Sequence, residues 1–184
     1  MAIGAACGPS VVSSTSTTAS AAKSAPSARV ALPGACVDPL ADARRRLGAD
    51  ADEKGVRVEP LDLDLDGVAD AMLTHEAFCG TGGCKWELYV RRDACAHWVG
   101  ELFAVLPLSQ PGRHHGLVDL SAVVRNGCAG MARAELRVRF DGSTYVVDRM
   151  RTCRCPDDDD RVGDDVDPDR DCDAWHAPSK ETKP

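Results

Sequence analysis

Four aspartates follow one another at short intervals between residues 62 and 70, and one glycine, Gly67, stands among them. Calcium and other hard divalent cations are bound by oxygen ligands, and short loops of this kind supply them from alternate residues around a glycine that permits a sharp turn. The spacing therefore predicts a calcium site. Its five predicted ligands are the side chains of Asp62, Asp64, Asp66 and Asp70 and the backbone carbonyl of Val68.

The same stretch also fits an amphipathic strand, because Leu61, Leu63 and Leu65 alternate with aspartates. A strand would place three like charges about 7 Å apart along one face, in a residue type that strands disfavour. It would also leave Gly67 and Asp70 without a role. A bound cation accounts for all of these positions, so we favour the metal loop over the strand.

The loop differs from an EF-hand, whose twelfth position is a bidentate glutamate, because this chain has Leu73 there. Its flanks also favour strands over helices. The stretch resembles the DxDxDGxxD calcium loops of FG-GAP (integrin-type) repeats, which lie between two strands. The resemblance implies that positions 1, 3, 5, 7 and 9 bind the ion. It covers about 12 residues and occurs once, so it does not imply a propeller, which needs several repeats.

Nine cysteines are a high number for 184 residues, and such a content is typical of exported proteins that contain disulfides. Cys79 and Cys84 enclose Gly-Thr-Gly-Gly and predict a tight disulfide loop, with an anion-binding glycine loop as the alternative. The acidic loop, the CGTGGC segment and residues 86–90 together are similar to uncharacterised secreted bacterial proteins and lipoproteins. That similarity covers about residues 60–150 and implies no activity.

Cys153 and Cys155 are separated by one residue, so a bond between them would be strained and each is expected to have a distant partner. Together with Cys172 and His176 they offer an alternative, a Cys3His zinc site.

The composition predicts three regions: a signal remnant and flexible Ser-Thr-Ala tether at 1–35, a disulfide-linked β-rich domain with the calcium loop at 36–155, and an acidic disordered tail at 156–184. The net charge of −7 resides in the tail, since segment 156–173 has ten Asp and two Arg, a net of −8. The remaining chain has 20 basic and 19 acidic residues and no basic patch of the kind that nucleic-acid binding requires.

The segment Ile3-Gly-Ala-Ala-Cys7 resembles the end of a bacterial lipoprotein signal, in which the cysteine becomes lipidated. The resemblance implies export to the cell envelope, with a lipid on Cys7 as the expected contact with a membrane. A secreted, extracellular protein is the alternative.

Periodicity predicts a mainly β fold of the α+β class, an antiparallel sheet or small sandwich of about six to seven strands with one N-terminal helix. The helix is expected after a cap at Asp38, with an apolar stripe of Leu40, Ala43 and Leu47. A first strand is expected at Val56 and to stop near Pro60. The other expected strands are 71–74, 86–91, 98–106, 117–124, 132–140 and 145–150.

These features favour a non-enzymatic, calcium-binding, disulfide-stabilised protein of the envelope or medium, serving as a binding module for an unidentified protein or glycan. Two alternatives remain. One is an inhibitor or immunity-type protein that blocks a partner enzyme. The other is a hydrolase that uses His114 or His115, which follow Pro111 and Gly112 in an expected turn.

Overall fold

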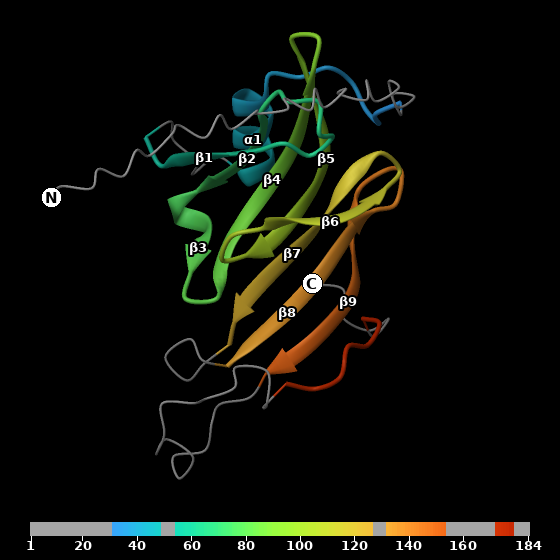
Figure 1. The fold of residues 1–184 in the computed structure, drawn as a ribbon. Helices are drawn as coiled ribbons and strands as arrows, with labels where there is room; N and C mark the ends of the chain where they lie inside the picture. The colour runs from blue at the N-terminus through green and yellow to red at the C-terminus, as the bar shows by residue number, and fades with distance from the viewer. Residues whose placement is uncertain (1–30, 49–53, 127–131, 154–171, 179–184) are drawn as a thin grey trace, which may run out of the picture.

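The computed structural model describes residues 31–48, 54–126, 132–153 and 172–178, which form two antiparallel sheets and one α-helix (Figure 1). The elements in chain order are α1 (Pro39–Leu47), β1 (Val56–Leu61), β2 (Asp70–His75), the 3₁₀ helix η1 (Glu76–Phe78), β3 (Cys79–Gly80), β4 (Gly83–Arg92), β5 (Cys95–Ala104), β6 (Leu108–His114), β7 (Leu117–Arg125), β8 (Arg133–Phe140) and β9 (Tyr145–Cys153). Within the described ranges, no helix has the length and hydrophobicity that a membrane span requires.

The first sheet runs in the order β1-β2-β4-β3, with β5 paired to the other edge of β4, and the second runs in the order β6-β7-β8-β9. Neighbouring strands of the second sheet follow one another along the chain. The strands β6 and β7 are joined by a tight turn at His115-Gly116, in which both residues have positive φ.

The main core lies between the two sheets. Every second residue of β4 enters it, namely Trp86, Leu88 and Val90, all at most 1% exposed. They pack with the inward residues of the second sheet, among them Leu120 and Phe140. The alternation predicted for this strand is therefore correct, and it assigns the other residues of β4 to the opposite face.

A smaller core forms where α1 covers that opposite face, with Ala43 and Leu47 against Ala71, Leu73 and Tyr89. A polar contact lies within it. Asp42 is 5% exposed and accepts hydrogen bonds from Arg46 Nε at 2.7 Å and from the Tyr89 hydroxyl at 3.0 Å. The Asp42 carboxylate thus fixes the helix to β4.

The sequence-based fold class is confirmed: the structure is mainly β, antiparallel, with one described helix and disulfides. The predicted cap is also present, since Asp38 Oδ1 accepts from Ala41 N at 2.8 Å. The strands at 98–106 and 117–124 are confirmed in β5 and β7.

Two details of the prediction were wrong, and the first strand ends one residue after Pro60, near which it was expected to stop. Nine strands are present in the described residues instead of six or seven, because the short β3 and the edge strand β6 carried no clear alternation. The first strand continues through Pro60 to Leu61, which is tolerated because β1 is an edge strand. Leu40 is 39% exposed and lies outside the buried stripe of α1, since the apolar residues of the helix that pack on the sheet are Ala43 and Leu47.

Three disulfides join described residues: Cys36–Cys95, Cys79–Cys84 and Cys153–Cys172. The Cys79–Cys84 bond confirms the predicted tight loop, which forms the β3–β4 hairpin. The Cys153–Cys172 bond corrects the zinc alternative, because it leaves neither sulfur as a thiolate ligand. Cys7, Cys128 and Cys155 lie outside the described residues, as do residues 1–30 of the tether predicted at 1–35 and residues 156–171 of the acidic tail predicted at 156–184.

Part of the range predicted as a disordered tail belongs to the folded body. His176 pairs with Met150 of β9 through two backbone hydrogen bonds of 2.9 and 3.0 Å, and Cys172 is bonded to Cys153. The disulfide and the Trp175 side chain attach residues 172–178 to the sheet, and charge composition gave no sign of either contact.

We expect Asp42→Ala to lower the free energy of unfolding by about 2–4 kcal/mol, because it leaves the buried Tyr89 hydroxyl and the Arg46 guanidinium without their acceptor. The control is Asp38→Ala, which removes only the helix cap and should cost about 1 kcal/mol. Urea unfolding followed by circular dichroism measures both. A loss no larger in Asp42→Ala than in the control would contradict this role.

Candidate metal centre

The predicted calcium loop joins β1 to β2, so both of its flanks are strands, as the sequence analysis expected. Pro60 and Leu61 still pair with Ala71 and Asp70, so the loop begins and ends side by side at one end of that hairpin. Leu65 and Gly67 have φ angles of 58° and 86°, and the glycine stands where the chain reverses. The strand alternative for this stretch is therefore wrong.

Three of the predicted ligands converge. Single carboxylate oxygens of Asp62, Asp64 and Asp70 lie within 4.8 Å of one another. Asp70 is 2% exposed, and the side chain of Asp64 is 6% exposed. Carboxylates that lie this close together and are shielded from solvent repel one another unless a bound cation or protonation compensates their negative charge.

Asp66 and Val68 are placed differently. Both are exposed, and Asp66 Oδ1 accepts a hydrogen bond from the backbone of Val68 at 2.8 Å, which makes a local turn. Asp66 does not belong to the group of converging carboxylates. Its role as a ligand, and that of the Val68 carbonyl, stay predictions.

Asp70 holds the loop in place. Its Oδ2 accepts from the backbone N–H of Leu63 at 2.7 Å, and its Oδ1 accepts from the backbone N–H of Arg91 at 2.6 Å. Burial raises the pKa of Asp70 to about 6, against these two hydrogen bonds, and the neighbouring Asp64 and Asp62 add to the rise. The carboxylate is thus anchored by backbone donors and lacks sufficient positive charge nearby.

Asp62 has an unused oxygen. Its Oδ2 accepts from Gly67 N at 3.1 Å, while its Oδ1 is buried and has no hydrogen-bond partner among the described residues. An orphaned buried carboxylate oxygen costs free energy, and a bound cation would satisfy it. The donor set of hard carboxylate oxygens fits calcium or another hard divalent cation.

Arginines that the sequence analysis did not connect with the loop lie beside it. Arg92 Nε contacts Asp64 Oδ2 at 2.8 Å, and Arg113 Nη2 donates to the Asp64 carbonyl at 2.8 Å. They come from β4 and β6, at a distance in sequence that no spacing rule connects to residue 64. Arg92 neutralises part of the cluster and is the structural alternative to a metal ion.

The histidine pair lies at the β6–β7 turn, as predicted. His114 is the last residue of β6, and its Nδ1 contacts Asp119 Oδ1 at 2.6 Å, while His115 occupies the turn. Among the described residues, His114 hydrogen-bonds neither a serine nor a cysteine, and its side chain is 44% exposed. A histidine and a carboxylate without a nucleophile do not make a hydrolase triad.

Comparison with known proteins gives no further assignment: no family model, no curated protein and no solved structure matches the chain.

Asp70 and Asp62 should behave differently in the absence of metal. In EDTA at pH 7, we expect Asp70→Ala to lower the free energy of unfolding by about 2–4 kcal/mol, because two buried backbone donors lose their acceptor. We expect Asp62→Asn to change it by no more than about 0.5 kcal/mol, since the amide oxygen can take the place of Oδ2 and accept from Gly67 N, and one repelling charge is removed. Chemical denaturation tests both, and similar losses in the two variants would refute this division of roles.

Proposed function

We propose that this protein binds calcium at Asp62, Asp64 and Asp70 as a structural ion, and that it is a non-enzymatic, disulfide-stabilised protein of the cell envelope or medium. Its body would serve as a binding module for a protein or glycan. The observation that carries the metal proposal is the convergence of three carboxylates, one of which, Asp62, has a buried Oδ1 without a hydrogen-bond partner among the described residues. Several disulfides are typical of an oxidising, exported environment.

The place of the loop supports a structural ion. Leu63, inside the loop, is fully buried in the core between the sheets, and its carbonyl accepts from Val118 N of β7 at 2.8 Å. An ion held by Asp62 and Asp64, the two neighbours of Leu63, would therefore stabilise the junction of both sheets. Its binding free energy would add directly to the stability of the fold.

The absence of an acidic residue at Leu73 also favours a structural ion over a sensor. Leu73 is 2% exposed and packs under α1, so the twelfth position of the loop belongs to the core. A loop that opens on ion release would have to disturb this packing. Lipidation at Cys7 would add a membrane anchor to the same protein.

The test of the metal proposal is a calcium titration of the EDTA-treated, dialysed protein by isothermal calorimetry, with the melting temperature measured in parallel. We expect calcium binding and a rise in melting temperature. In Asp62→Asn, which removes one ligand charge, the affinity for calcium should fall about tenfold or more and the rise in melting temperature should be smaller. Glu59→Gln, which changes a half-exposed carboxylate of β1 outside the cluster, is the control. No heat and no rise in the wild type would refute the proposal.

The same titration with Arg92→Gln separates the metal from its structural alternative. If the carboxylates are ligands, the loss of a competing cation at Asp64 strengthens calcium binding. If Arg92 is itself the group that neutralises Asp64, the Arg92→Gln variant loses stability and gains no affinity for calcium.

Calcium binding should depend on pH through Asp70. Because burial raises the pKa of this carboxyl to about 6, calcium must displace a proton below that pH, and its affinity should fall by up to about tenfold per pH unit. Without calcium the sign is opposite: the folded state holds the Asp70 proton more tightly than the unfolded chain, so the Asp70 contribution to stability falls as pH rises from about 4 to 6.

The difference in melting temperature with and without calcium, measured from pH 5 to pH 7.5, checks this. It should grow up to about pH 6.5 and then level off. A calcium effect independent of pH over this range would show that Asp70 is not in the site.

A further inference from the structure

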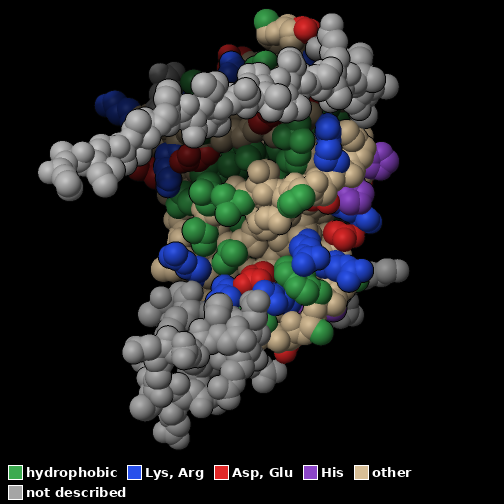
Figure 2. All heavy atoms as spheres, viewed as in Figure 1, with side chains coloured by type: hydrophobic (Ala, Val, Ile, Leu, Met, Phe, Trp, Pro, Cys, Tyr) green, Lys and Arg blue, Asp and Glu red, His purple; other side chains and the backbone are tan. Residues whose placement is uncertain are grey.

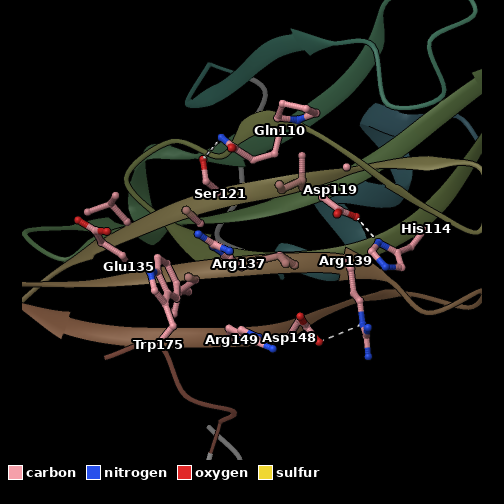
Figure 3. A pocket seen from close by; sticks show the side chains of 17 residues that line it. Gln110, His114, Asp119, Ser121, Glu135, Arg137, Arg139, Asp148, Arg149 and Trp175 are labelled. Atoms are coloured by element: carbon pink, nitrogen blue, oxygen red, sulfur yellow. Dashed lines mark hydrogen bonds and ion pairs between the residues drawn. The ribbon is translucent and has the colours of Figure 1, made fainter. Parts of the chain in front are cut away.

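The outward face of the second sheet carries a groove of about 600 Å³, far from the acidic loop in sequence. Figure 3 shows its polar side chains, which come from β6, β7, β8 and β9 and from Trp175. Figure 2 shows basic and acidic side chains close together over this part of the surface, next to histidines at its edge. The volume is in the range of small-ligand sites.

Two arginines oppose each other in the floor of this groove. Arg137 of β8 is the direct cross-strand partner of Arg149 of β9, and both are exposed. Like charges directly opposite each other on a sheet are destabilising. An arrangement of this kind is stabilised when an anion binds between the two guanidinium groups.

The carboxylates of the same face are already engaged. Asp148 contacts Arg139 Nε at 3.2 Å, and Asp119 contacts His114 at 2.6 Å. Glu135 is shared by two further arginines, Arg133 at 2.7 Å and Arg151 at 2.6 Å.

Five arginines therefore face three carboxylates. Among the described residues, neither Arg137 nor Arg149 has a carboxylate partner.

Neutral groups beside the arginine pair complete a polar row across the strands. Ser121 of β7 is the cross-strand partner of Arg137, and its Oγ accepts from Gln110 Nε2 at 2.8 Å. That bond leaves the Ser121 hydroxyl hydrogen free to donate. Ser121, Arg137 and Arg149 thus present donors in one line, and the Gln110 side chain orients the first of them.

Trp175 forms one wall and restrains Arg137. The Arg137 guanidinium lies 4.4 Å from the centre of the indole ring, and the Arg151 guanidinium lies 4.9 Å from it. Such cation–π contacts hold a guanidinium in place without neutralising its charge. Trp175 thereby holds the Arg137 guanidinium in a position to bind an anion. Among the described residues, no carboxylate neutralises its positive charge.

We propose that this groove binds a tetrahedral oxyanion, a phosphate or sulfate group carried by a small ligand. Planar guanidinium groups bind such tetrahedral anions through paired N–H donors, and two of them opposite each other can bind one anion from both sides. A phosphate monoester offers them two negative charges near neutral pH, and a sulfate monoester offers one. The Ser121 hydroxyl supplies a further donor. The volume exceeds that of the free anion and leaves room for the organic part of an ester. This proposal goes beyond calcium binding and does not rest on it.

The test uses the full chain in low-salt buffer with EDTA, so that calcium plays no part. Inorganic phosphate, inorganic sulfate, glucose 6-phosphate and glucose 6-sulfate are titrated separately by calorimetry, against sodium chloride at equal ionic strength. We expect at least one of the two phosphate compounds and at least one of the two sulfate compounds to bind more tightly than chloride does. Preference for the phosphate pair or the sulfate pair then identifies the source of the oxyanion.

Arg149→Gln is the decisive variant, because Arg149 is exposed and, among the described residues, has no hydrogen-bond or ion-pair partner whose loss would affect folding. We expect its affinity for the anions to fall about tenfold or more, and Ser121→Ala to lose severalfold. Arg57→Gln removes an equally exposed arginine from β1 and should bind like the wild type. Equal affinity in Arg149→Gln and the wild type, or no binding beyond that of chloride, would overturn the proposal.

Discussion

The buried carboxylate of Asp70 is the interaction on which the arrangement of this protein depends. It stands at the first residue of β2 and accepts hydrogen bonds from Leu63 in the acidic loop and from Arg91 at the end of β4. The acidic loop, β2 and the more distant end of β4 therefore meet at one side chain. Leu63 continues the connection, since it is buried in the core and its carbonyl bonds to Val118 in the other sheet.

This arrangement places negative charge where water is excluded, and the raised pKa of Asp70 shows what that costs. The structure offers two compensations. Arg92 contacts Asp64 directly, and the space between Asp62, Asp64 and Asp70 suits a divalent cation. One arginine opposite three carboxylates leaves excess negative charge and an orphaned Asp62 oxygen, and this imbalance is the physical reason to propose calcium.

The opposite imbalance exists on the outward face of the second sheet, where arginines outnumber carboxylates. The groove on this face depends on the C-terminal segment. The Cys153–Cys172 disulfide and the pairing of His176 with Met150 attach that segment to β9. Without that attachment, Trp175 would not lie over Arg137. The Cys153–Cys172 disulfide at the end of β9 thus helps to position Trp175, which forms one wall of the groove.

The sequence by itself determined the mainly β fold, the capped helix, the last hairpin and the Cys79–Cys84 loop, because each follows from local periodicity or from neighbours a few residues apart. It also identified the aspartates that converge, since Asp62 to Asp70 lie in one loop. It could not place Arg92 and Arg113 beside that loop, nor separate Asp66 from the group, because these depend on which strands become neighbours.

The groove was equally beyond sequence reasoning. The arginines of β8 were visible as the polar half of an alternating strand, which by itself indicates only a solvated face. That Arg137 opposes Arg149, and that Trp175 from the predicted tail covers it, follows from strand register and a disulfide. Only the tertiary structure decides these, because pairing between strands and between cysteines joins residues whose separation in sequence carries no information about their distance in space.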